Sequence, residues 1–104
     1  MSGSGGGGYG GPTRSSSDCN IVERVPLNSP QAPVLKRLRV GDTLEVEVLN
    51  KGQSLVAKYK NEVAGSLTPQ ALLDLLECIE KGRVYIAHVV ELSGGFCEVE
   101  IRPK

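Results

Sequence analysis

The regular alternation of apolar and charged side chains over residues 43–49 constrains this chain more than any other feature. From Leu44 to Val48 every second residue is apolar, and a glutamate lies between each apolar residue and the next. Successive side chains of a β-strand point to opposite faces, so the pattern predicts a strand with one buried face. Turn residues at 50–53 and an apolar run at 54–59 extend this strand into a predicted hairpin.

The remaining elements are arranged around one helix. Further strands are predicted at 20–25, 63–67, 83–92 and 96–102, with a short turn-like or helical piece at 34–38. Thr68 is predicted to cap a helix with Pro69 in its first position, and Gly82 is predicted to end it. The strand at 83–92 is apolar on both faces, so we expect it to be central, between the helix and the barrel interior.

These elements predict a mainly β fold with one α-helix. The expected architecture is a small OB- or SH3-like barrel of five to six strands, with the helix between two hairpins. The predicted inward-facing residues of the helix and the last strand are Leu72, Leu75, Leu76, Ile79, Cys97, Val99 and Ile101.

The chain divides into a tail at 1–18 and one domain at 19–104. Seven of the first twelve residues are glycine, a composition that predicts a flexible tail, either a passive linker or a functional glycine-rich arm. The tail has no apolar core of a secretory signal, and no stretch approaches the roughly 20 apolar residues of a membrane helix. We therefore expect a cytoplasmic protein with no membrane contact.

The thiols and the single imidazole are expected to be structural. Cys19, Cys78 and Cys97 are odd in number and far apart, so we expect reduced, packed thiols and neither a disulfide nor a zinc site. His88 is expected in the core with one hydrogen-bond partner. Cys97 is a possible cross-strand neighbour of His88, but its inward position predicts an inert thiol. No metal and no cofactor are expected.

One cluster has the composition of a nucleic-acid surface. Its predicted members are Lys36, Arg37, Arg39, Lys58, Tyr59 and Lys60. A base could stack on Tyr59 while the cations contact phosphates. The alternative is that these charges form the solvated face of a hairpin and a turn. An acidic set on the outward face, Glu45, Glu47, Glu98 and Glu100, would repel phosphates if its strands are neighbours.

The order of motifs resembles the HIRAN domain. The similarity runs from Leu38-Arg39-Val40-Gly41-Asp42-Thr43-Leu44, through Val63-Ala64-Gly65-Ser66-Leu67 and the helix, to Gly82-Arg83-Val84-Tyr85-Ile86-Ala87-His88-Val89. The resemblance implies a small β-barrel that grips the free 3′ end of single-stranded DNA as an accessory to a larger enzyme. The chain departs from the family at residues 50–57, which lack the usual Asn-Pro-x-Asp-x-Asn-Ala stretch.

Two functions follow from the sequence. The first is a non-catalytic module that binds single-stranded DNA or a DNA end. The second is a protein-interaction adaptor, or a small subunit of a bacterial multi-protein system, that binds a protein partner or forms a homo-oligomer. An enzyme is not expected, because no pair of titratable groups is placed to divide acid and base roles.

Overall fold

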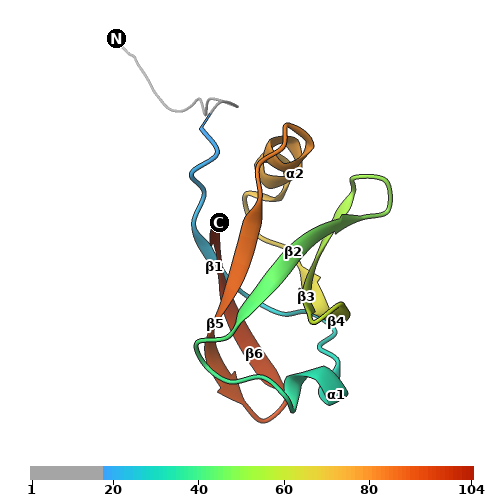
Figure 1. The fold of residues 1–104 in the computed structure, drawn as a ribbon, viewed down its shortest axis with the longest axis vertical. Coiled ribbons are helices and arrows are strands. Elements are labelled where there is room, and N and C mark those ends of the chain that lie inside the picture. Colours follow the sequence, from blue (N-terminus) through green and yellow to red (C-terminus); the bar gives the residue numbers. More distant parts are fainter. Residues whose placement is uncertain (1–17) are drawn as a thin grey trace.

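The computed structural model describes residues 18–104, which form one antiparallel sheet and two helices (Figure 1). The strands are β1 (Glu23–Pro26), β2 (Thr43–Leu49), β3 (Ser54–Tyr59), β4 (Glu62–Leu67), β5 (Tyr85–Ser93) and β6 (Phe96–Pro103), and the helices are α1 (Ala32–Leu35) and α2 (Leu72–Glu80). The strand order is β1-β6-β5-β2-β3-β4. The sequence-based fold class, a mainly β barrel-like fold with a helix between two hairpins, is confirmed.

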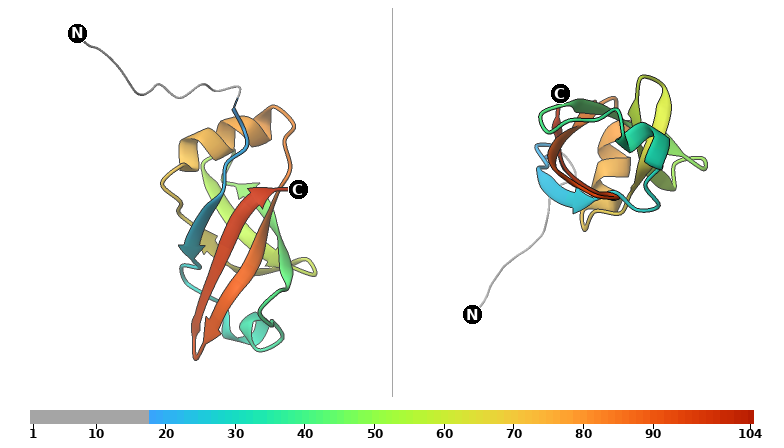
Figure 2. Two further views of the ribbon diagram at one scale, coloured as in Figure 1. Left: turned by 90° about the vertical axis from the view of Figure 1, so that its left-hand side faces the viewer. Right: turned by 90° about the horizontal axis from the view of Figure 1, so that it is seen from below.

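The sheet curls into a half-barrel, and the segment after β1 bridges its two edges (Figure 2). The amide of Leu27 donates to the carbonyl of Cys97 in β6 at 2.8 Å. One residue later, Asn28 and Ser66 exchange two backbone hydrogen bonds of 2.9 Å, which reach β4. The segment therefore links β6 to β4 and partly covers the backbone of β4.

Several element boundaries differ from the prediction, most of all those of β1 and α1. β1 begins at Glu23 rather than residue 20 and includes Pro26, because proline is tolerated in an edge strand where its missing N–H breaks no ladder bond. The short helical piece also begins earlier, at Ala32, with Pro33 in its first turn.

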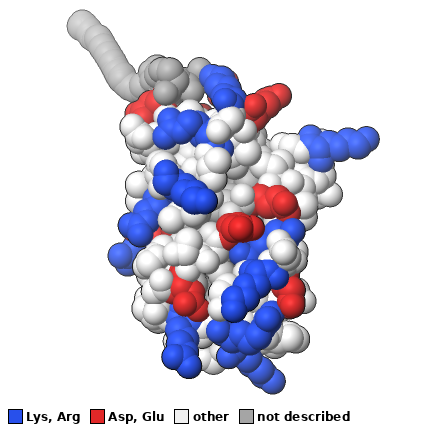
Figure 3. Space-filling model, viewed as in Figure 1, with Lys and Arg blue, Asp and Glu red and all other residues white. Residues whose placement is uncertain are grey.

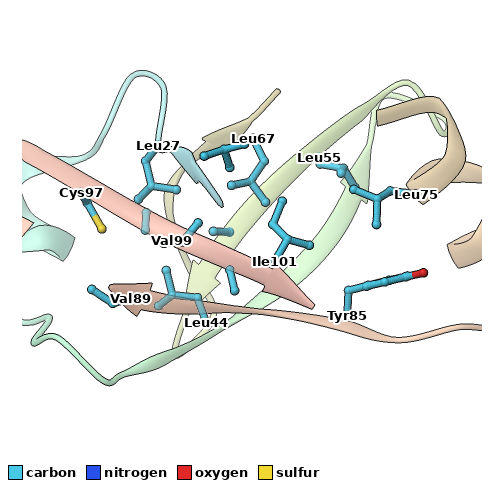
Figure 4. Packing of buried hydrophobic residues seen from close by; sticks show 14 of the residues in the cluster. Leu27, Leu44, Leu55, Leu67, Leu75, Tyr85, Val89, Cys97, Val99 and Ile101 are labelled. Carbon is cyan, nitrogen blue, oxygen red and sulfur yellow. The ribbon is translucent and has the colours of Figure 1, made fainter. Parts of the chain in front are cut away.

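Side chains from every strand and from α2 fill the interior of the half-barrel (Figure 4). The predicted alternation is confirmed in β6, where Cys97, Val99 and Ile101 are fully buried. In β2, Leu44 is fully buried, while Val46 and Val48 are partly buried against the same core. Tyr85 of β5 and Leu75 of α2 close the core at the end that carries the helix.

The predicted start of the long helix is wrong. α2 begins at Leu72, and the Thr68 hydroxyl accepts a hydrogen bond from the side-chain amide of Asn28 at 2.6 Å instead of capping the helix. The Glu23 carboxylate of β1 accepts the backbone amides of residues 70–71 at 2.6 and 3.1 Å. A carboxylate at this position satisfies free amides and interacts favourably with the helix dipole.

The position of α2 also differs from the prediction. The helix does not cover a face of β5. It lies across one end of the half-barrel, where Leu75 and Cys78 enter the core (Figure 1). The predicted end is confirmed, because Gly82 adopts a φ of 104° directly after the last helical turn and its amide donates to the carbonyl of Ile79 at 2.9 Å.

The expectation of three reduced thiols is wrong, because Cys19 and Cys78 form a disulfide. Both residues are buried, with exposed fractions of 4 % and 1 %. The bond joins the segment before β1 to α2, and the Tyr85 hydroxyl donates a hydrogen bond to the Cys19 carbonyl in the same region. Disulfides persist mainly in oxidising compartments, so this bond gives no support to the expected cytoplasmic location. Neither described helix is long and apolar enough to cross a membrane.

Candidate functional site

The predicted basic residues lie toward the end of the molecule that carries α1, opposite α2. Lys and Arg side chains gather at this end, with acidic side chains between them (Figure 3). Lys36, Arg37 and Arg39 follow α1, and Tyr59 and Lys60 lie at the turn between β3 and β4. We call these five residues the basic end.

Arg37, Tyr59 and Lys60 form the centre of the basic end. The Arg37 guanidinium lies 5.8 Å from the centre of the Tyr59 ring, and the Lys60 ammonium lies 5.3 Å from it. Both are cation–π distances. The ring also packs against the barrel core, so its faces are less open to a base than the sequence suggested.

Some of the predicted cations are neutralised by carboxylates. Arg37 forms an ion pair with Glu62 at 2.6 Å, and Lys58 forms one with Glu47 at 2.9 Å. Lys58 lies opposite Glu45 in the pairing of β2 with β3, on the outer face of the sheet. Strand alternation therefore separates Lys58 from Tyr59, although the two are adjacent in sequence.

Three predicted cations make no ion pair within residues 18–104: Lys36, Arg39 and Lys60. Lys36 lies beside a pocket of about 180 Å³ between α1 and the turn at Gly94 and Gly95. The Asp42 carboxylate accepts the backbone amide of Arg39 at 2.9 Å, which fixes the loop and leaves the guanidinium unpaired. These three side chains are the phosphate-binding candidates of the basic end.

The predicted acidic set is not continuous. β5 separates β2, which carries Glu45 and Glu47, from β6, which carries Glu98 and Glu100. Within β6, Glu100 lies 3.6 Å from both Arg24 and Arg102. Repulsion of phosphates from this face is therefore weaker than the sequence suggests.

The expectation for His88 is wrong. His88 lies on the outer face of β5, opposite Glu100 of β6 and Thr43 of β2, and it is only partly buried. Its Nδ1 atom is buried and has no hydrogen-bond partner among residues 18–104. The residues on either side of His88, Ala87 and Val89, are the ones that face the core. The apolar flanks of His88 concealed its position from the sequence analysis.

The buried position predicted for Cys97 is confirmed. Cys97 is fully buried on the core side of β6, whereas His88 is on the opposite side of the sheet, so the two cannot act as nucleophile and base. Burial raises the pKa of the Cys97 thiol to about 11, which keeps it protonated near neutral pH. No group of three or more metal-ligating side chains occurs within residues 18–104.

Sequence reasoning missed a groove at the opposite end from the basic cluster. Its volume is about 470 Å³, and it lies between α2 and the hairpin of β2 and β3. The lining residues are Val48, Lys51, Gly52, Leu73, Leu76, Glu77, Ile79 and Glu80. Leu73 is 79 % exposed, which is unusual for a leucine. Its position in the sequence, outside the inward-facing set of the helix, is a signal that could have indicated the groove.

Comparison with known proteins gives no relative for this chain. No protein-family model, no curated protein and no solved structure matches it.

Proposed function

We propose that the protein is a non-catalytic binding module whose basic end binds a single strand of nucleic acid. The observation that carries the proposal is the group of unpaired cations Lys36, Arg39 and Lys60 at one end of the barrel. The resemblance to the HIRAN domain supports a DNA strand as ligand and a free 3′ end as the part that is gripped.

Phosphate contact supplies most of the binding in this proposal. Lys36, Arg39 and Lys60 make no ion pair within residues 18–104, although the Lys60 ammonium lies over the Tyr59 ring, whereas Arg37 is paired with the carboxylate of Glu62. The Tyr59 ring lies between the barrel core and two cations, so stacking of a base on it contributes less than in a module with an open aromatic platform. The expected ligand is therefore bound with little base specificity and with a strong dependence on salt.

The test is fluorescence anisotropy with a labelled oligothymidylate and the full chain. Three phosphate contacts on a single strand predict a loss of affinity of about 20-fold between about 50 and 200 mM salt. Lys36→Glu combined with Lys60→Glu should abolish binding. Blocking the 3′ hydroxyl of the oligonucleotide should weaken binding if the strand end is gripped.

The matched control is Lys51→Glu at the hairpin beside α2, compared with Lys36→Glu and Lys60→Glu as single variants, because each of the three changes the net charge by the same amount. The control should retain most of the affinity, because Lys51 lies outside the basic end. Equal weakening by Lys51→Glu would show non-specific attraction to overall charge. Absence of binding at tens of micromolar in low salt would refute the proposal.

A second candidate function, binding of a polypeptide, is favoured by the apolar groove beside α2. This surface is separate from the basic end, and its acidic residues Glu77 and Glu80 make it unsuitable for a phosphate backbone.

A further inference from the structure

The backbone of β2 has a free edge beside the groove. β2 pairs with β3 over Glu45–Leu49, but it pairs with β5 only over Thr43–Glu45. β2 and β5 then diverge toward the end that carries α2 (Figure 1). Residues 46–49 therefore have no strand partner on the side that faces β5 within the described chain. An unpaired strand edge presents alternating N–H and C=O groups to an added strand.

The groove of about 470 Å³ lies next to this free edge. Val48 belongs to both, since it lies in the unpaired part of β2 and lines the groove. Leu73 adds exposed apolar surface, with an exposed fraction of 79 %. The site thus combines main-chain hydrogen-bonding groups with an apolar cleft, the two components of peptide recognition by strand addition.

The charges around the groove indicate the chemistry of the occupant. On the wall formed by α2, Glu77 forms an ion pair with Lys81 at 3.7 Å, whereas Glu80 makes no ion pair within residues 18–104. Lys51, on the hairpin wall, also makes no ion pair there, so the carboxylates lie on the α2 side of the groove alone. A basic side chain of a partner would therefore gain an unpaired carboxylate on the wall formed by α2.

We infer that this site binds an extended segment of another polypeptide, which adds as a strand to residues 46–49 of β2. Alternate side chains of an added strand point to one face, so an apolar residue of the segment enters the groove and a lysine or arginine reaches Glu80. This inference is independent of nucleic-acid binding at the basic end, because it uses none of the same residues.

The experiment begins with a phage-displayed library of linear peptides, selected on the full chain with its disulfide intact. The selected peptides should carry an apolar residue and a nearby lysine or arginine. In titrations with the synthetic peptide, Leu73→Asp should weaken binding at least about tenfold, as expected for an anchor contact. An aspartate in the first turn of α2 is compatible with the helix, so this variant should remain folded.

The matched control is Val40→Asp, an exposed apolar residue outside the groove with an exposed fraction of 63 %. It should leave the affinity for the peptide unchanged. Glu80→Lys should weaken the binding of peptides with a basic residue, and it should strengthen the binding of peptides with an acidic residue at the same position. Equal weakening by both aspartate variants, or no effect of Leu73→Asp, would overturn the inference.

Strand addition itself is tested on the backbone. Amide hydrogen exchange of residues 46–49 should slow in the complex, and N-methylation of alternate peptide bonds in the ligand should abolish binding. Binding that is insensitive to N-methylation and leaves exchange at 46–49 unchanged would show side-chain docking and refute strand addition. Failure to select any peptide that competes at the groove would refute the site as a whole.

Discussion

Removal of the bond between Cys19 and Cys78 should lower the free energy of unfolding by about 4 kcal/mol. The two cysteines are 59 residues apart in sequence, and the chain-entropy relation for closing a loop of that length gives about 4 kcal/mol at 25 °C. Domains of this size have a total stability of about 5–15 kcal/mol, so the bond supplies a large fraction of it. The expected decrease in Tm is roughly 15–30 °C.

The assay is urea unfolding with and without a reductant, because the reduced wild type keeps both sulfur atoms and loses only the link. The variant with Cys19→Ala and Cys78→Ala is the control. It should be unaffected by the reductant, and it carries an additional cost from lost packing, since both positions are buried.

Thiol titration in denaturant tests the premise directly. The non-reduced protein should show a single thiol, that of Cys97, which is the free cysteine of the described chain. Three titratable thiols, or a stability change on reduction of less than about 1 kcal/mol, would contradict the role given to the bond.

Three further perturbations test other parts of the fold. Glu23→Gln should destabilise the protein by about 0.5–2 kcal/mol through loss of the carboxylate cap of α2, measured by urea unfolding. Gly65→Ala should lower the free energy of unfolding by about 1–3 kcal/mol, because a Cβ atom there would lie 2.9 Å from the Leu27 Cβ. Gly95→Ala is the control and should leave stability nearly unchanged, because a Cβ atom at that position meets no atom within 4 Å. Burial raises the pKa of the Cys97 thiol from 9.0 to about 11, so the unfolded chain loses this proton at a lower pH than the folded protein does. The free energy of unfolding should therefore fall by about 2–3 kcal/mol as pH rises from 9 to 11. Below about pH 9 the thiol is protonated in both states and contributes no slope, and Cys97→Ala should flatten the decrease in urea unfolding above that pH.

The strands were predictable because their signal is local. The alternation in β2 and β6 has a period of two, and each inward residue is specified by its immediate neighbours. The end of α2 was predictable for the same reason, since Gly82 directly follows the last turn. His88 was misplaced because its apolar neighbours suggested burial on both faces, although only one face of β5 meets the core.

The features that sequence reasoning missed depend on contacts between distant residues. The cap of α2 comes from Glu23, 47 residues before the first amide that it accepts. Cys19 and Cys78 have no spacing motif that would indicate their pairing. The free edge of β2 arises because β5 begins only at Tyr85 and the two strands diverge, and no pattern within β2 encodes that divergence.

The same distant contacts fix one wall of the groove. α2 belongs to no strand ladder, so its position depends on Leu75 in the core and on two ties to the segment 19–23. The disulfide holds the last turn of the helix, and the Glu23 carboxylate holds its start. Glu23 belongs to β1, which pairs with β6, so the segment transmits the position of the sheet to the helix. Loss of either tie should therefore loosen the groove before it opens the barrel, and amide exchange should increase in α2 while the amides of β5 and β6 remain protected.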